Sequence, residues 1–235
     1  MTSSKQLKLG ISKPFPCSYL SDKEEQLLVV VDEEVKSPDV YAFLVEKGFR
    51  RSGDQVYQPY CGSCKACQSI QIPTKSFKPS KSQKRNLKKN GDITVGISNS
   101  IKDSYYPLYE NYINTIHKDG VMYPASEEQF DGFIRSQFYE QLFIELKLDK
   151  KLIGVAVVDK LSNGLSAIYT FYEPMLSRRG LGVFSILIEI KIAKELGLEY
   201  VYLGYQISAC TKMNYKTKYK PYQLLVNNTW KTVNK

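Results

Sequence analysis

The stretch between residues 165 and 203 reads as a strand, a glycine-bearing turn, a helix and a second strand. Residues 165–172 are a run of β-branched and aromatic side chains, which is typical of a strand. Gly180 and Gly182 follow, and residues 183–196 carry apolar side chains at helical spacing until Gly197. Residues 200–203 are a short apolar run of the kind found in buried strands. This order predicts a β-α-β unit with the glycine turn at the N-terminus of its helix.

The turn is suited to holding an anion. Free N–H groups and the positive end of the helix dipole favour negative charge, and glycines allow close approach to the backbone. Arg178 and Arg179 add two permanent charges that suit phosphate or carboxylate. The turn lacks the Gly-Lys-Ser/Thr ending of a P-loop and the third glycine of a dinucleotide site. It resembles the pyrophosphate turn of GNAT-type N-acyltransferases; the alternative is a basic tight turn without a ligand.

A second basic feature lies between residues 75 and 89, where every charged side chain is positive. Ser80 and Gln83 form a capping box and Asn90-Gly91 a stop, so we expect a helix between them. Only Leu87 is large and apolar there, and the chain as a whole carries a formal net charge of +9. Contact with a nucleic-acid backbone is favoured over a solvated surface. The expected contacts are Lys81, Lys84, Arg85, Lys88 and Lys89.

Tyrosines and lysines alternate between residues 202 and 222. Aromatic faces beside lysines are the composition of a groove that stacks bases and binds phosphates. We therefore expect Lys212 and Tyr215 to line a nucleic-acid groove. Packing in the core is the alternative for the tyrosines.

Cys61, Cys64 and Cys67 are spaced by two residues each, and Cys17 could join them as a fourth ligand for zinc or an iron–sulfur cluster. Partly buried free thiols are favoured over a metal, because strong zinc signals have two separated pairs. The single histidine, His117, lies in an aromatic helical segment, which argues against a Ser-His-Asp or Cys-His hydrolase. No secretory signal and no apolar run of transmembrane length is visible, so we expect a cytoplasmic protein.

A composition shift between residues 90 and 104 predicts two domains, at 14–90 and 104–226. The first is a smaller α/β domain with the cysteines and the basic helix. The second begins with helices over 104–117 and after Ser126, continues with antiparallel strands over 142–148 and 152–159, and ends in one strand near residues 224–230. The fold class is therefore α+β, with a GNAT-like domain built on a mostly antiparallel sheet.

Five segments in order resemble the arginyl-tRNA–protein transferase family, and most closely its bacterial aspartate/glutamate leucyltransferase branch. They are residues 48–53, 60–67, 77–83, 169–182 and 202–215. The resemblance implies transfer of leucine from leucyl-tRNA to the N-terminal amine of proteins that begin with Asp or Glu, which makes an N-degron. It implies no cofactor for the chemistry. Leu20 stands where larger relatives have the second cysteine of a Cys-x-x-Cys, and we expect no metal.

Within that reaction, Asp159, Glu173 or Tyr205 is the expected relay for the proton that moves from the amine to the ribose oxygen. Arg178, Arg179, Gly180 and Gly182 are expected to hold either the terminal phosphates of the tRNA or the acidic side chain of the acceptor. Three alternatives stay open: arginine as the transferred group, a tRNA-binding module without catalysis, and a CoA-dependent N-acetyltransferase.

Overall fold

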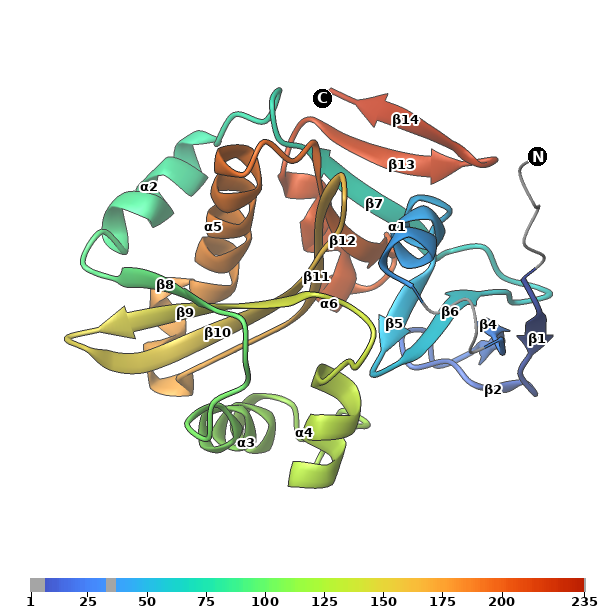
Figure 1. Cartoon of the computed structure of the whole chain (residues 1–235), viewed down its shortest axis with the longest axis horizontal. Helices are drawn as coiled ribbons and strands as arrows, with labels where there is room; N and C mark the ends of the chain where they lie inside the picture. Colours follow the sequence, from blue (N-terminus) through green and yellow to red (C-terminus); the bar gives the residue numbers. More distant parts are fainter. Residues whose placement is uncertain (1–6, 33–36, 235) are drawn as a thin grey trace.

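An eight-stranded sheet forms the centre of the molecule (Figure 1). The computed structural model describes residues 7–32 and 37–234. Neighbouring strands of this sheet are antiparallel except β11 and β12, which are parallel as the β-α-β unit requires. In spatial order the strands are β14 (Thr229–Val233), β13 (Tyr222–Val226), β7 (Gln68–Pro73), β12 (Tyr200–Gln206), β11 (Gly164–Tyr172), β10 (Lys151–Lys160), β9 (Gln141–Leu148) and β8 (Thr94–Ser98).

Helices cover both faces of this sheet (Figure 1). On one face α5 (Leu181–Glu195) packs against β11 and β12, and α2 (Lys81–Lys89) packs against α5. On the other face lie α3 (Tyr105–Ile116) and α4 (Glu127–Ile134). Alternate residues of β10 enter the two cores, Ala156 on the α5 side and Val157 on the α3 side. The strand is therefore apolar on both faces.

A smaller sheet in the N-terminal part has the order β1 (Leu9–Ile11), β4 (Leu27–Val30), β6 (Gln55–Pro59) and β5 (Arg50–Ser52). Helix α1 (Pro38–Glu46) begins where the side chain of Ser37 accepts from the Val40 N–H, with Pro38 in the first turn. It packs with β4 and β6 in a core that also takes residues from β12. Two further strands, β2 (Phe15–Pro16) and β3 (Glu24–Glu25), pair with each other.

The expected α+β class with a mostly antiparallel sheet is confirmed. The single strand expected near residues 224–230 is wrong, because β13 and β14 form a hairpin there. Asn227 and Asn228 both have positive φ at its tip, a conformation that asparagine adopts more readily than most residues. Strand β8 lies in the segment that was expected to link two domains. The division at 14–90 and 104–226 stays a prediction.

The remaining short elements follow β11 and β12. They are η2 (Pro174–Arg179), α6 (Thr211–Asn214) and η3 (Tyr215–Lys218). Within the described ranges, each helix is too short or too polar to cross a lipid bilayer.

Candidate functional site

Strands β11 and β12 separate after three residue pairs. Pairing runs from Gly164 opposite Tyr200 to Ser166 opposite Tyr202, and the strands share no pairs beyond it. Residues 167–170 of β11 are half-buried, whereas β12 stays buried to its end. The bend in β12 falls at Gly204, which has φ +74° and lies against the Arg50 guanidinium. The separation leaves the inner edge of β11 without a neighbouring strand.

Arg50 occupies the point where the two strands separate. One guanidinium NH₂ group donates to Ser166 Oγ at 2.6 Å, and the other donates to the carbonyl oxygen of Ala167. A Cβ at residue 204 would lie 3.1 Å from Arg50 Nε, so the glycine makes room for this side chain. The buried guanidinium of Arg50 therefore lies where the pairing of β11 with β12 ends and the unpaired edge of β11 begins.

The Gly180 turn stands at the other end of that edge and is held by α2. Asn86 Nδ2 donates to the carbonyl oxygens of Arg179 and Gly180, each at 3.1 Å. Asn90 Nδ2 donates to the Arg179 carbonyl at 3.0 Å, and Lys89 Nζ donates to the Arg178 carbonyl at 2.5 Å. Gly180 has φ +68°, and no side chain caps α5 there. The basic helix and the turn thus form one connected unit.

The two arginines of the turn differ. Arg178 is exposed, as an anion ligand would need to be. Arg179 makes a two-bond ion pair with Asp92, with both nitrogen–oxygen distances 2.8 Å. This pair lowers the pKa of the Asp92 carboxyl. Arg179 therefore supports the turn in this arrangement, and Arg178 is the arginine open to a ligand. Gly182 is half-buried, and a Cβ there would lie 3.8 Å from the Tyr172 ring.

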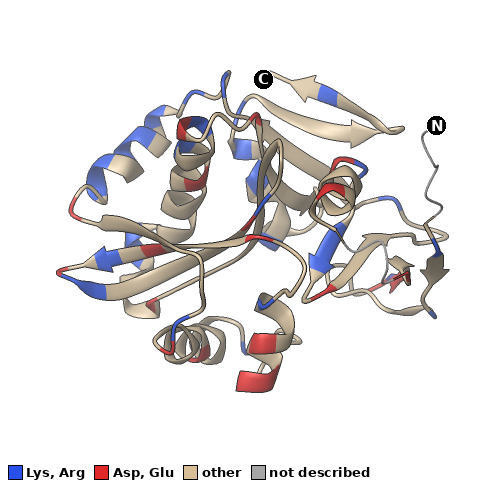
Figure 2. Ribbon diagram, viewed as in Figure 1, with Lys and Arg blue, Asp and Glu red and all other residues tan. Residues whose placement is uncertain are grey.

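The cations of α2 are exposed, and most of the α2 ribbon is coloured as Lys or Arg in Figure 2. Both bonds of the expected capping box form at Ser80 and Gln83. Gln83 is buried and its Nε2 donates to the Lys218 carbonyl at 3.2 Å, which ties α2 to η3. The exposed cations are Lys81, Lys84, Arg85, Lys88 and Lys89.

The expected groove residues, Lys212 and Tyr215, differ in exposure and contacts. Tyr215 is 36% exposed, and burial together with the Glu189 carboxyl raises its pKa to about 12. Lys212 pairs with Asp119 at 2.6 Å on the surface. Such an exposed pair contributes little and can exchange for a phosphate.

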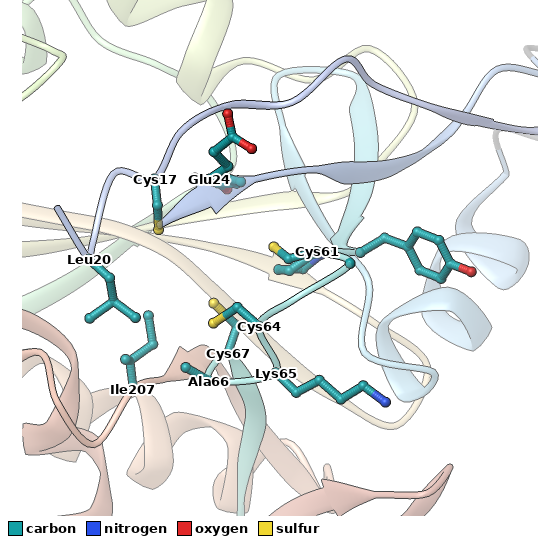
Figure 3. Close-up of a pocket in the computed structure, with 13 residues that line it drawn as sticks. Cys17, Leu20, Glu24, Cys61, Cys64, Lys65, Ala66, Cys67 and Ile207 are labelled. Atoms are coloured by element: carbon teal, nitrogen blue, oxygen red, sulfur yellow. The ribbon is translucent and has the colours of Figure 1, made fainter. Parts of the chain in front are cut away.

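Four cysteines line one pocket of about 430 Å³ near β3 and the end of β6 (Figure 3). Cys17 comes from one segment, and Cys61, Cys64 and Cys67 come from another. All four are free thiols, and burial, followed by the neighbouring thiols, raises the pKa of Cys67 to about 12. Over the residues that the structure describes, no set of three or more His, Cys, Asp or Glu side chains is arranged to hold a metal ion.

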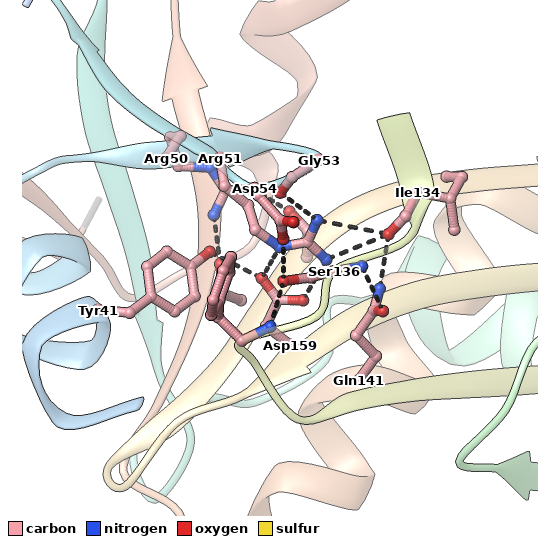
Figure 4. A network of polar contacts seen from close by, with 12 residues as sticks. Tyr41, Arg50, Arg51, Gly53, Asp54, Ile134, Ser136, Gln141 and Asp159 are labelled. Carbon is pink, nitrogen blue, oxygen red and sulfur yellow. Dashed lines mark hydrogen bonds and ion pairs between the residues drawn. The ribbon is translucent and has the colours of Figure 1, made fainter. Parts of the chain in front are cut away.

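Asp159 lies at the centre of a buried network (Figure 4). Arg51 donates to both of its oxygens, from Nε at 2.7 Å and from an NH₂ group at 2.5 Å. Tyr41 donates a third hydrogen bond at 2.7 Å, and both side chains of the ion pair have no exposed surface. This geometry joins β5 to β10 through Asp159, and neither carboxylate oxygen is exposed to a substrate.

The other two proposed relay residues differ in their surroundings. The Tyr205 hydroxyl is buried and donates to the Gly48 carbonyl at 2.8 Å, and burial raises its pKa well above the ordinary value. Glu173 is half-buried at the start of η2, where it accepts from the Met175 N–H and from Asn111 Nδ2, each at 3.3 Å. Among the three, Glu173 is the one that solvent can reach.

Two buried charged residues, Glu189 and Lys216, were not expected from the sequence. Glu189 on α5 is 1% exposed, and burial raises its pKa to about 8 against the opposing effect of Arg50. Lys216 is 8% exposed and donates to the Tyr205 carbonyl at 2.6 Å; burial lowers its pKa to about 7. A single acid within the apolar run of residues 186–190 is the signal that could have identified Glu189.

His117 is placed as expected, packed at the end of α3. Its Nε2 lies 3.2 Å from the Tyr112 hydroxyl, and burial lowers its pKa. Its position gives no support to a hydrolase.

Two family models match this chain. The model of the arginine-tRNA-protein transferase C terminus covers residues 104–226, and the model of the N terminus covers residues 15–85. The chain belongs to the arginine-tRNA-protein transferase family. The resemblance read from the five segments is confirmed, and with it the expectation of an enzyme of the transferase class.

Three relatives match this chain over nearly the full length of both proteins, and all three are named aspartate/glutamate leucyltransferase. The protein from Pseudoalteromonas atlantica is 51% identical and covers 97% of this chain and 99% of the relative. The proteins from Shewanella amazonensis and Pseudomonas fluorescens are 48% and 46% identical, and cover 98% and 100% of this chain and 97% and 100% of the relatives.

Among solved structures, the C-terminal domain of a lysylphosphatidylglycerol synthetase from Agrobacterium fabrum aligns with a TM-score of 0.47 and 14% identity, covering 73% of this chain and 52% of that chain. The family assignment rests on the sequence matches.

Proposed function

We propose that this transferase moves leucine from leucyl-tRNA to the N-terminal amine of proteins that begin with Asp or Glu. The observation that carries the proposal is the 51% identity, over nearly full length, to a relative named aspartate/glutamate leucyltransferase. Proteins that share this much sequence over their whole length keep the same architecture, so the donor and acceptor of that relative are the first to test here.

The connected unit of α2 and the Gly180 turn supports a tRNA donor. Five exposed cations on α2 would neutralise phosphates of the acceptor arm without reading its sequence. Arg178 and the uncapped start of α5 would receive the phosphates nearest the terminal adenosine. The aminoacyl group would then lie along the open edge of β11, with Lys212 and Tyr215 beside the strand end.

The reaction needs the protein mainly to hold the aminoacyl ester and the acceptor amine in contact. An aminoacyl ester is already activated, and an α-amino group with a pKa of about 7.7–8.0 is partly neutral near pH 7. Holding the two substrates in contact supplies a large part of the rate enhancement. The reaction would take place in the cytoplasm, where charged tRNA is made, and its product would be an N-degron.

The test combines two donors with four acceptors. Purified protein is incubated with radiolabelled leucyl-tRNA or arginyl-tRNA and with peptides that begin with Asp, Glu, Lys or Ala. Label that moves from leucyl-tRNA to the Asp and Glu peptides, and to neither of the others, is the expected result. Arginine transfer to the same two peptides would contradict leucine as the donor group. Tight tRNA binding without any transfer would indicate a binding module.

A further inference from the structure

Tyr172 is the last residue of β11, where the strand no longer pairs with β12 and the chain continues through η2 to the Gly180 turn. Its side chain is half-buried and packs against both cores of the large sheet. The preceding residue, Phe171, is fully buried on the α3 side, so alternation along the strand would point Tyr172 to the α5 side alone. A ring that reaches both cores therefore lies across the unpaired edge of β11.

One side of the Tyr172 ring is supported by α3. The centroid of the Tyr112 ring lies 4.9 Å from that of Tyr172, and the two ring planes are inclined at 57°. Tyr112 is only 8% exposed, and its hydroxyl lies 3.2 Å from Nε2 of His117, which fixes it in turn. Tilted aromatic pairs of this kind favour a defined mutual orientation. The Tyr172 ring is therefore held in place before any ligand binds.

The Tyr172 ring also lies against the first turn of α5. A Cβ at residue 182 would lie 3.8 Å from Cε1 of Tyr172, so the ring is at van der Waals distance from this glycine. Gly182 is two residues, roughly 3 Å along the helix axis, from the uncapped start of α5 at Gly180. The proposed function places the last phosphates of the tRNA at that start. Tyr172 is therefore within reach of the nucleotide to which those phosphates belong.

A second accessible ring belongs to the same cluster. Tyr215 of η3 is 36% exposed, and after burial the phenol groups of Tyr172 and Tyr215 are among the causes that raise the pKa of Tyr112. Phenol groups from α3, β11 and η3 thus converge near the start of α5. Arg178 of η2 and Lys212 of α6 are exposed cations on the adjoining segments. Accessible aromatic rings beside cations are the composition of a site for an unpaired nucleotide.

We propose that Tyr172 is the platform on which the terminal adenine of the tRNA stacks. The inference rests on the proposed function, because it requires a tRNA donor. The aminoacyl ester is carried by the ribose of that same terminal nucleotide, so a base held on Tyr172 also positions the ester at the unpaired edge of β11. Tyr172 recognises the face of the base and adds no preference for the sequence of the acceptor arm.

The first experiment compares wild type, Tyr172→Phe and Tyr172→Leu in binding a complete tRNA and the same tRNA without its terminal adenosine. Phenylalanine keeps the ring, whereas leucine keeps an apolar side chain but has no face for stacking. Filter binding at one salt concentration gives the two Kd values of each protein. We expect wild type and Tyr172→Phe to bind the complete tRNA at least about fivefold more tightly than the shortened one, and Tyr172→Leu to bind both about equally.

The matched control is Tyr106→Leu. Tyr106 of α3 is also half-buried, but its ring contacts Phe130 and its hydroxyl donates to Glu110, away from α5. This variant should keep the preference of wild type for the complete tRNA. Loss of affinity for both tRNAs would report a damaged fold, whereas loss of the stack lowers affinity for the complete tRNA alone.

A second experiment needs no substitution, so it decides the question even if Tyr172→Leu does not fold. Wild type is irradiated with tRNA that ends in 8-azidoadenosine, and the crosslinked residue is identified by mass spectrometry. The expected adduct is on Tyr172. An adduct found only on residues outside the cluster of Tyr112, Tyr172 and Tyr215 would overturn the proposal, because the terminal base would then lie elsewhere.

Four binding results would also overturn the assignment, and they differ in meaning. A preference that survives in Tyr172→Leu means that the base stacks on another side chain. A preference lost equally in Tyr172→Phe means that the hydroxyl, and not the ring face, makes the contact. If Tyr172→Leu weakens binding of leucyl-tRNA but not of uncharged tRNA, the ring contacts the leucyl group. If wild type binds neither tRNA and transfers no leucine, the proposed function itself fails.

Discussion

Replacing Glu189 with glutamine should make this protein more stable, and increasingly so as the pH rises. The folded state raises the pKa of this carboxyl from an ordinary 4.5 to about 8, with burial as the main cause. Between those two values the folded state binds more protons than the unfolded state, so stability falls as pH rises. Each pH unit costs about 1.4 kcal/mol, which amounts to about 3 kcal/mol at pH 7 and approaches about 5 kcal/mol above pH 8.

Urea unfolding of wild type and Glu189→Gln at pH 5, 7 and 8.5 measures this cost. The difference in unfolding free energy should be below about 1 kcal/mol at pH 5, because this pH lies only about half a unit above the ordinary pKa of 4.5 that holds in the unfolded chain. It should reach about 3 kcal/mol at pH 7. The buried Lys216, whose pKa is lowered to about 7, makes stability rise with pH above that value. Lys216 is present in both proteins, so its contribution cancels in the difference.

The matched control is Glu195→Gln at the exposed end of the same helix. Its partner Lys191 lies 3.8 Å away, and both side chains are more than 60% exposed, so the control should differ from wild type by less than about 0.5 kcal/mol at every pH. A difference for Glu189→Gln that stays constant from pH 5 to pH 8.5 would refute the reasoning, because it would mean that the carboxyl ionises as easily in the folded protein as in the unfolded chain.

Two further predictions concern α2 and the buried ion pair. Changing Lys84, Arg85 and Lys88 together to alanine should weaken tRNA binding and lower the slope of log Kd against log salt by about 2, since each lost phosphate contact removes about 0.7–0.9; filter binding at several salt concentrations measures it. Arg51→Met should cost about 3–5 kcal/mol of unfolding free energy in urea, because it leaves the Asp159 carboxylate buried without its cation.

Each of these variants has a control on the same protein. Lys191 and Lys194 are exposed on α5 away from the Gly180 turn, and changing both to alanine should leave the salt slope unchanged. Arg135 pairs with Asp131 at 3.3 Å on the surface, so Arg135→Met should cost less than about 1 kcal/mol. An equal effect of test and control variants would contradict the assigned surface in the first case and the assigned burial in the second.

Local sequence signals predicted the elements that depend on local contacts. The capping box at Ser80 and Gln83 joins residues three apart, and the helix between Ser80 and Asn90 appears where it was expected. The hairpin at the C-terminus was missed, although Asn227-Asn228 is a turn signal, because the flanking strands are short and only partly buried.

The roles of the site residues depend on partners far away in the chain, and one sequence does not display such pairs. Arg179 was assigned to an anion, but Asp92 from the loop after α2 takes its guanidinium. Asp159 was assigned to proton transfer, but Arg51, 108 residues earlier, takes both of its oxygens. The sequence shows the basic turn and the acid at the strand end correctly. The role of each residue, however, depends on its tertiary partner, which the sequence does not show.

The position of β7 has a consequence for synthesis of this protein on the ribosome. This strand is made early, yet both of its neighbours in the sheet, β12 and β13, come from the last part of the chain. Roughly half of the chain must be synthesised after β7 before its N–H and C=O groups find their partners. During that interval an apolar strand with Ile70 and Ile72 has two unpaired edges. Newly made chains are therefore expected to need protection from association until the C-terminal strands emerge.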